Sequence, residues 1–280
     1  MMELLILIYA CRTSTSKTIT AILPYLPYSK QCKLKRRSSI AMKLMADLIS
    51  KTGACRVVSM DLYKKEIQGF FTIPMDNLRA SPLTIPYIKA NIPDYKNAVI
   101  VAKHPEMLSK ATSYSERLKI GVAVIHGSYA ECEESTSRDG RQSPPPESES
   151  TPDKEAKSFG HPPLSLVGDV SGKIAILVDD IIDEAQSFIE AADLLKSRGA
   201  YKVYVMGTHG LLSGDAPSLF EESSINEVIV TNTVPHDVQK MRCHKIKTVD
   251  ISLMLCEAIR RIYNNESMGI LFRDAAHDDY

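Results

Sequence analysis

The chain has 280 residues, with 34 lysine and arginine residues against 34 aspartate and glutamate residues, so its formal net charge is zero. This length allows one large domain or two ordinary ones, and with balanced charge no overall electrostatic field favours nucleic acid or membranes. The six cysteines show no C-x-x-C pair and no zinc spacing, which indicates reduced thiols in a cytoplasmic protein.

The first half of the chain alternates short apolar strands with helices. The apolar run at 4–10 follows Glu3 without a basic leader and is too short to cross a membrane, so we interpret it as a core element at the edge of the fold. The later elements are expected to be strands at 18–23, 56–60, 98–102 and 121–125, helices at 40–51 (capped by Ser38), 81–91 and 109–118, and a turn at 67–71.

Residues 127–163 are dense in serine, glutamate and proline, including the run Ser143-Pro144-Pro145-Pro146. A segment of this composition cannot bury enough apolar surface to offset the entropy of ordering it. We therefore predict a disordered insertion here, between an N-terminal domain at 1–126 and a C-terminal domain at 164–280.

The most informative stretch begins with five apolar residues at 174–178, which are typical of a strand buried on both faces of a parallel sheet. Asp179, Asp180 and Asp183 follow at its carboxyl end, and then comes a helix that Gly199 ends. Ligands of open α/β sheets bind outside the carboxyl ends of the strands. Acids in this place are candidates for holding a metal ion or ribose hydroxyls.

The remaining pattern predicts strands at 202–207, 227–231 and 247–250, a loop at 208–214, and a helix at 251–263 with one apolar face that includes Ile259. Short buried strands that alternate with helices favour mainly parallel sheets. We therefore expect two α/β domains in series.

Several unrelated short motifs, in the right order, resemble the ribose-phosphate pyrophosphokinase family. They are Met60-Asp61-Leu62-Tyr63, Ile67-Gln68-Gly69-Phe70-Phe71, Val230-Thr231-Asn232-Thr233, Asp250-Ile251-Ser252 and Glu257-Ala258-Ile259-Arg260-Arg261. The resemblance implies two tandem type I phosphoribosyltransferase-like domains, and transfer of pyrophosphate from ATP to ribose 5-phosphate with magnesium. It begins at Met2, which implies that the N-terminal domain is truncated.

The chain is more similar still to the non-enzymatic branch of that family, the phosphoribosyl-pyrophosphate-synthetase-associated proteins. These carry an insertion where this chain has 127–163, and the segments at 178–183 and 77–82 look like theirs. The resemblance implies partnership with catalytic ribose-phosphate pyrophosphokinase subunits in a hetero- or homo-oligomer, with no nucleic acid or membrane partner.

The phosphoribosyl-pyrophosphate loop of the family has two adjacent acids, a third acid and then Thr-x-Gly-Thr. The acids survive as Asp179, Asp180 and Asp183, but the next four residues are Glu184-Ala185-Gln186-Ser187. A phosphate needs small residues that let backbone N–H groups approach it, and Glu184 brings negative charge instead. We interpret the three acids as a vestigial binding loop.

The other family sites have also drifted. The ATP-binding Tyr-x-Arg-Gln-Asp is Tyr28-Ser29-Lys30-Gln31-Cys32, which makes Lys30 and Gln31 a vestigial ATP site. The metal-binding histidine is Tyr63, a poor magnesium ligand. The Lys-x-Arg of the catalytic loop is Gly127-Ser128-Tyr129, so two cations that stabilise the transferring group are missing.

Each candidate residue also has a structural interpretation. For Asp179, Asp180 and Asp183 we favour a role at a strand end and helix cap over residual magnesium or phosphosugar binding. We expect His209 to serve turn geometry or an interface rather than catalysis. His104 and Glu106 could be imagined as metal ligands, but nothing near them in the sequence supports this. Phe70 and Phe71 are expected in the core or a subunit interface.

The sequence therefore favours a catalytically silent regulatory subunit that binds and restrains ribose-phosphate pyrophosphokinase. It would have no catalytic residue and would require no cofactor. We assign no metal ligand, although the sequence leaves weak magnesium binding as an alternative. The alternative is an active magnesium-dependent pyrophosphokinase with a degenerate site. A third reading is a product left non-functional by its missing N-terminal portion.

Overall fold

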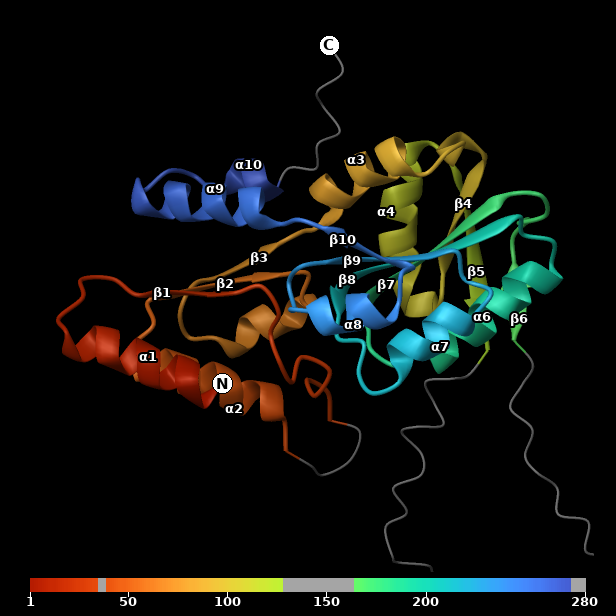
Figure 1. Cartoon of the computed structure of the whole chain (residues 1–280). Coiled ribbons are helices and arrows are strands. Elements are labelled where there is room, and N and C mark those ends of the chain that lie inside the picture. Colours follow the sequence, from red (N-terminus) through yellow and green to blue (C-terminus); the bar gives the residue numbers. More distant parts are fainter. Residues whose placement is uncertain (35–38, 128–163, 273–280) are drawn as a thin grey trace, which may run out of the picture.

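The computed structural model describes residues 1–34, 39–127 and 164–272, which form two sheets covered by helices (Figure 1). In this part of the chain no helix is both long enough and apolar enough to span a membrane.

The smaller sheet has three parallel strands in the order β1 (Thr20–Leu23), β2 (Arg56–Met60) and β3 (Met75–Leu78). Its two faces are covered by α1 (Met2–Thr13) and α2 (Ala41–Thr52) on one side, and by α9 (Ser252–Tyr263) and α10 (Gly269–Phe272) on the other (Figure 1). Because successive side chains of a strand point to opposite faces, Val57 packs with α1 and α2 while Val58 packs with α9.

The larger sheet has seven strands, all parallel except for the antiparallel pair β5–β6. Across the sheet these strands are β10 (Ile246–Val249), β9 (Glu227–Thr231), β8 (Lys202–Gly210), β7 (Ile174–Ile182), β4 (Ala98–Ala102), β5 (Gly121–His126) and β6 (Ser165–Val167). The helices around it are α3 (Ser81–Asn91), α4 (Leu108–Leu118), α6 (Gln186–Ser197), α7 (Ala216–Glu222) and α8 (Asp237–Arg242). The prediction of an α/β fold with mainly parallel sheets is confirmed.

Strand β7 lies in the middle of this sheet and is buried on both faces. Ala175 and Leu177 pack with α6 and α7 on one face, whereas Ile176 and Val178 pack with α3 and α4 on the other. Two buried faces explain why the strand reads as a continuous apolar run instead of an alternating one.

The sheets correct the predicted domain boundary at residue 126. Strand β4 pairs in parallel with both β5 and β7, so residues 98–126 belong to the larger sheet and not to the first domain. At the other end of the chain, α9 returns to the smaller sheet, where Met254 and Ala258 pack against β2 and β3. Strand pairing joins residues far apart in sequence, and the order of elements along the chain did not reveal it.

Several predicted elements differ from those observed. Strands β7 and β8 are longer than predicted, so Asp179, Asp180 and His209 lie within strands. Residues at 65–70 form a 3₁₀ helix, η1 (Lys65–Phe70), and β3 was not predicted. Two more 3₁₀ turns are η2 (Tyr95–Asn97) and η3 (Pro105–Met107).

Other predictions concern side-chain burial and segments outside the described part. Phe71 is buried and Phe70 packs beside it, which confirms the core interpretation of this pair. Ile259 on α9 is 51% exposed, so its predicted place on the apolar face is wrong. The predicted cap Ser38, and the insertion at 127–163 apart from Gly127, lie outside the described residues.

Candidate functional site

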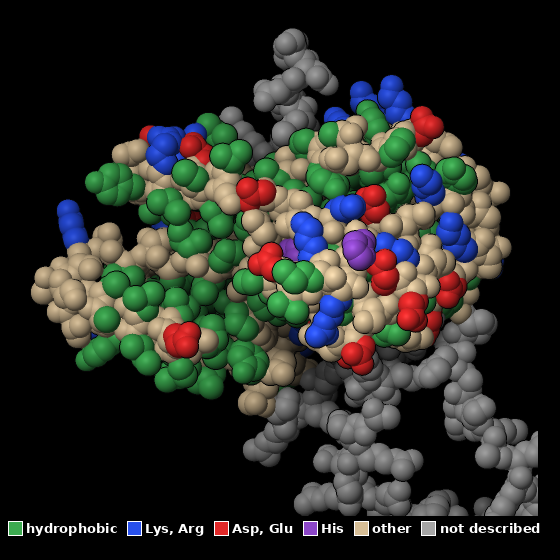
Figure 2. Space-filling view, viewed as in Figure 1, with side chains coloured by type: hydrophobic (Ala, Val, Ile, Leu, Met, Phe, Trp, Pro, Cys, Tyr) green, Lys and Arg blue, Asp and Glu red, His purple; other side chains and the backbone are tan. Residues whose placement is uncertain are grey.

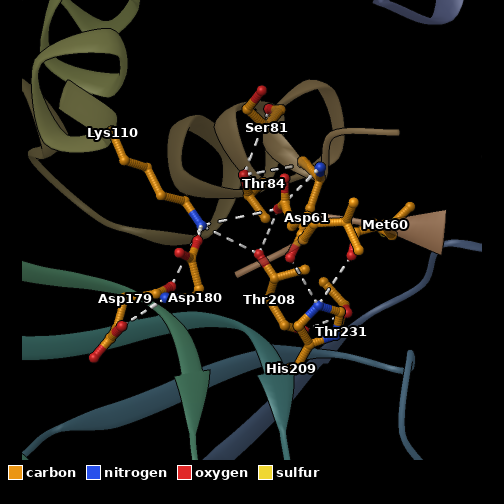
Figure 3. Close-up of polar contacts among 12 residues, drawn as sticks. Met60, Asp61, Ser81, Thr84, Lys110, Asp179, Asp180, Thr208, His209 and Thr231 are labelled. Atoms are coloured by element: carbon orange, nitrogen blue, oxygen red, sulfur yellow. Dashed lines mark hydrogen bonds and ion pairs between the residues drawn. The ribbon is translucent and has the colours of Figure 1, made fainter. Parts of the chain in front are cut away.

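Asp179 and Asp180, near the carboxyl end of strand β7, are each paired with a lysine of the same chain. Figure 3 shows the pair of Asp180 with Lys110. Asp179 Oδ2 lies 3.7 Å from Lys103 Nζ, and these side chains are 15% and 8% exposed. Asp180 Oδ1 forms an ion pair with Lys110 Nζ, with exposures of 13% and 21%. Lys103 directly follows β4 and Lys110 lies on α4, so the neighbouring strand and its helix supply both cations.

The Lys110 ammonium has further oxygen atoms around it. Its Nζ lies 3.4 Å from the Asp179 carbonyl oxygen, 3.4 Å from Thr208 Oγ1 and 3.9 Å from Asp61 Oδ2. Burial acts to lower the pKa of Lys110, but the carboxylates of Asp180 and Asp61 outweigh it and raise that pKa above its usual value. Lys110 therefore remains a charged ammonium group.

Asp61 connects this cluster to the smaller sheet, because it directly follows β2. Its backbone has φ of 39°, a conformation that costs a non-glycine residue about 1 kcal/mol or more. Its Oδ2 accepts hydrogen bonds from Thr208 Oγ1 at 2.6 Å and from the Ala80 amide at 3.2 Å. These bonds tie the end of β2 both to β8 of the larger sheet and to the start of α3.

His209, the next residue on β8, makes a second connection between the sheets. Its Nε2 lies 3.1 Å from the Met60 carbonyl oxygen and 3.2 Å from that of Asp61, and its Nδ1 lies 2.9 Å from Thr233 Oγ1. Carbonyl oxygens only accept, so Nε2 carries the proton and Nδ1 accepts from the threonine hydroxyl. Burial lowers the pKa of His209, and the positive charge of Lys110 lowers it further. These two effects outweigh the opposing effect of Asp61, so the ring is neutral at pH 7.

We expect stability to fall between about pH 7 and pH 5 in a way that depends on His209. In the unfolded chain the imidazole takes up a proton near its ordinary pKa of about 6.5, whereas the folded site resists protonation to lower pH. The unfolded state then binds more protons, so the free energy of unfolding falls as the pH drops.

The measurement is urea unfolding at a series of pH values for wild type and His209→Asn. Each unit by which the pKa is depressed corresponds to about 1.4 kcal/mol of lost stability. The asparagine variant should lose less stability than wild type on acidification. Parallel pH profiles for the two proteins would contradict the assignment.

In the segment after β7, which the sequence resemblance compares with a phosphate cradle, groups of the chain contact one another. Helix α6 begins at Gln186 after Ala185, and no side chain caps it, so the predicted capping role of the acids is wrong. At this helix end Lys103 Nζ donates to Ser187 Oγ at 2.7 Å and lies 3.7 Å from the centre of the Phe188 ring. Glu184 is exposed beside it.

Asp183 differs from the other two acids. Its Oδ1 is buried, and among the described residues it has no hydrogen-bond partner. The Tyr25 ring lies near enough for the Asp183 charge to act with burial in raising the pKa of that phenol. Among the described residues, Asp183 is therefore the acid of this loop that has a buried acceptor atom without a hydrogen-bond partner.

The predicted ATP-site residues do not join this cluster. Lys30 and Gln31 lie in the loop after β1 with exposed side chains, which make no ion pair or hydrogen bond with the acids in the described ranges. A cavity of about 230 Å³ lies nearby, lined by Cys32, Lys33, Lys64, Glu66, Ile67 and Phe70. Tyr63 is half-buried and packs with the core beneath α2.

His104 and Glu106 do not form a metal site. Glu106 bridges two lysines, with Lys64 Nζ at 2.6 Å and Lys33 Nζ at 3.5 Å. Burial lowers the pKa of His104. Throughout the described part of the chain, no cluster of three or more histidine, cysteine, aspartate or glutamate side chains is arranged to hold a metal ion.

Four members of the cluster were not picked out from the sequence as site residues: Asp61, Lys103, Lys110 and Thr208. Three of them could have been, because Asp61 and Lys103 directly follow apolar strands and Thr208 follows the predicted strand 202–207. Carboxyl ends of parallel strands meet at one edge of a sheet. Lys110 carries no such signal, since it reaches the site from a helix.

Comparison with known proteins decides the family. Residues 94–273 match the family model described as the phosphoribosyl synthetase-associated domain, and residues 1–53 match that of the N-terminal domain of ribose phosphate pyrophosphokinase. Phosphoribosyl pyrophosphate synthase-associated protein 2 of Xenopus tropicalis is 57% identical, over 99% of this chain and 79% of the relative. The human associated protein 1 is 56% identical, with coverage of 99% and 79%. The chain belongs to the family of phosphoribosyl pyrophosphate synthase-associated proteins.

A solved structure agrees with this membership of the associated-protein family. The crystal structure of phosphoribosylpyrophosphate synthetase from Mycobacterium smegmatis matches with a TM-score of 0.78 and 34% identity, over 94% of this chain and 78% of that one. The fold is therefore the type I phosphoribosyltransferase-like fold that the resemblance implied.

Proposed function

We propose that this member of the associated-protein family is a catalytically silent subunit. It assembles with catalytic ribose-phosphate pyrophosphokinase subunits and restrains their synthesis of phosphoribosyl pyrophosphate. It requires no cofactor of its own, and any magnesium binding by wild type is weak. We place it in the cytoplasm, and the five described cysteines are all free thiols, in keeping with a reducing compartment.

The observation that carries the proposal is that the chain's own lysines neutralise the acids of the vestigial loop. Lys103 pairs with Asp179 and Lys110 with Asp180, in a largely buried setting. Magnesium or ribose hydroxyls would have to compete with these lysines for the carboxylate oxygens. Breaking a buried ion pair is costly, because each charge is then left without compensation.

The alternative, a working pyrophosphokinase with a degenerate site, has one observation in its favour. Asp183 keeps a buried oxygen atom without a described hydrogen-bond partner, and such an atom could accept a ligand. A lone acceptor gives no positive charge to a transferring pyrophosphoryl group, which is what this reaction needs most. We therefore prefer the silent subunit.

The experiment is co-purification of the untagged chain with a tagged catalytic synthetase after co-expression. We expect the chain to be retained at physiological salt in a fixed ratio to the catalytic subunit, because the family fold persists while the site has drifted. The control is the same bait with an unrelated protein of similar size. Absence of the chain from the retained material would contradict the assembly.

A further inference from the structure

The surroundings of Lys110 have the composition of a cation site. Four oxygen atoms face its ammonium: Asp180 Oδ1, the Asp179 carbonyl, Thr208 Oγ1 and Asp61 Oδ2 (Figure 3). They come from β7, from β8 and from the segment after β2. Carboxylate, carbonyl and hydroxyl oxygens are the ligands that magnesium and calcium take. We call these four atoms the oxygen cage.

The ammonium also has more oxygen neighbours than a simple ion pair would give it. An ammonium group has three hydrogens to donate, fewer than the four oxygens around it. The Thr208 hydroxyl donates its proton to Asp61 Oδ2 at 2.6 Å, so a lone pair of Thr208 Oγ1 is left to face the lysine. Every cage atom therefore presents negative potential to the centre.

The charges around Lys110 also indicate a site for a divalent cation. Asp61 and Asp180 bring two negative charges to the cage, and Lys110 brings one positive charge. Asp179 contributes only its carbonyl here, because its carboxylate faces Lys103. A divalent ion would balance the two carboxylates, whereas the ammonium balances half of their charge.

We propose that the Lys110 ammonium is a built-in cation, filling an oxygen cage that would otherwise take a divalent metal ion and joining the two sheets without an exchangeable metal. The cage draws on both sheets, since Asp61 directly follows β2 and the other oxygens belong to β7 and β8. The inference deepens the proposed function, on which it rests for its biological meaning. A subunit with this permanent cation keeps its two sheets together whether or not magnesium is present.

Figure 2 shows how the two halves of the molecule differ on one face. Green apolar side chains dominate the half that holds the smaller sheet, and most of the charged side chains lie on the half that holds the larger one. Two halves of such different surface character are held together at the cage by polar bonds. Loss of the Lys110 ammonium should therefore destabilise the packing of both sheets.

The test is removal of the ammonium by Lys110→Ala, followed by titration with Mn²⁺ and measurement of free Mn²⁺ by electron paramagnetic resonance. We expect the variant to bind about one Mn²⁺ per chain with a dissociation constant on the order of 10⁻⁴ M, the weak end of carboxylate sites. Wild type should bind at least about tenfold more weakly. Equal binding by the two proteins, or none by the variant, overturns the proposal.

Two further variants make the result specific. Lys64→Ala also removes a lysine from an ion pair with a carboxylate, that of Glu106, which keeps Lys33 as its second partner. This pair lies outside the cage, so the variant should gain no Mn²⁺ site. Lys110→Ala combined with Asp61→Asn removes one cage carboxylate and should lose the site again. A gain in Lys64→Ala equal to that in Lys110→Ala would show unspecific binding and overturn the proposal.

Folding can be read in the same samples by circular dichroism. A Lys110→Ala chain that is unfolded in a chelator and folds on addition of Mg²⁺ supports the cage as strongly as Mn²⁺ binding does. A chain that stays unfolded in both overturns it. These measurements involve neither a partner protein nor catalytic turnover. Catalysis by wild type would therefore refute the proposed function without contradicting the oxygen cage. Conversely, a failure of the Mn²⁺ experiment would say nothing about assembly with catalytic subunits.

Discussion

Purified alone, this chain should form AMP from ATP and ribose 5-phosphate at least about 10⁴-fold more slowly than an active synthetase. Loss of one group that stabilises charge in the transition state costs about 10²–10³ in rate. The sequence lacks the Lys-x-Arg pair at 127–129, and the described site adds lysines that occupy Asp179 and Asp180. The expected overall loss of rate is smaller than the product of the separate losses, because the effects of such groups are not additive.

The assay needs protein free of host synthetase, with magnesium in excess. Asp179→Ala serves as the matched control, because it removes an acid of the vestigial loop and should leave the background rate unchanged. Turnover within about tenfold of an active synthetase, abolished by Asp179→Ala, would show a working enzyme.

Lys110→Met should lower the free energy of unfolding by roughly 3 kcal/mol, the lower part of the range for breaking a buried pair. Methionine keeps most of the side-chain volume and removes the charge, so the carboxylates of Asp61 and Asp180 are left in a site where they are 13% exposed. The lower value is chosen because the lysine side chain itself is 21% exposed.

Chemical unfolding of the variant and wild type provides the measurement. Lys96→Met is the control, because Lys96 is exposed and has no ion pair among the described residues, and it should change stability by less than about 0.5 kcal/mol. Adding Asp180→Asn to Lys110→Met should restore part of the loss, since one unpaired charge is removed. Equal stabilities of the Lys96 and Lys110 variants would contradict a buried, charge-balanced cluster.

The sequence placed β4 and the first five residues of β7 correctly, and both stretches are buried on two faces. Strands β4 and β7 are continuous apolar runs, and a run of this kind indicates burial without knowledge of the neighbours. Strand β3, by contrast, contains Asp76 and Asn77 and lies at the edge of the smaller sheet. Its conformation comes from pairing with β2, where Asp76 lies opposite Val58, and a local pattern cannot reveal a distant partner.

The same limit applies to the site. The sequence located Asp179 and Asp180 correctly at the carboxyl end of a central strand, because ligand sites of such sheets lie there. It missed the lysines that pair with them, since Lys103 lies 76 residues before Asp179 and Lys110 lies 70 residues before Asp180. As long as the pairing lysines are not recognised, the sequence cannot distinguish paired acids from acids that are free to bind a ligand.

The most direct test of a silent, restraining subunit is the rate of a fixed amount of active synthetase titrated with this chain. We predict that AMP formation per catalytic subunit falls and levels off at a fixed ratio of the two proteins, while mass photometry shows a mixed assembly. A rate that does not change, with the two proteins remaining separate, would contradict the account. A rate that rises in proportion to the added chain would show that the chain is itself an enzyme.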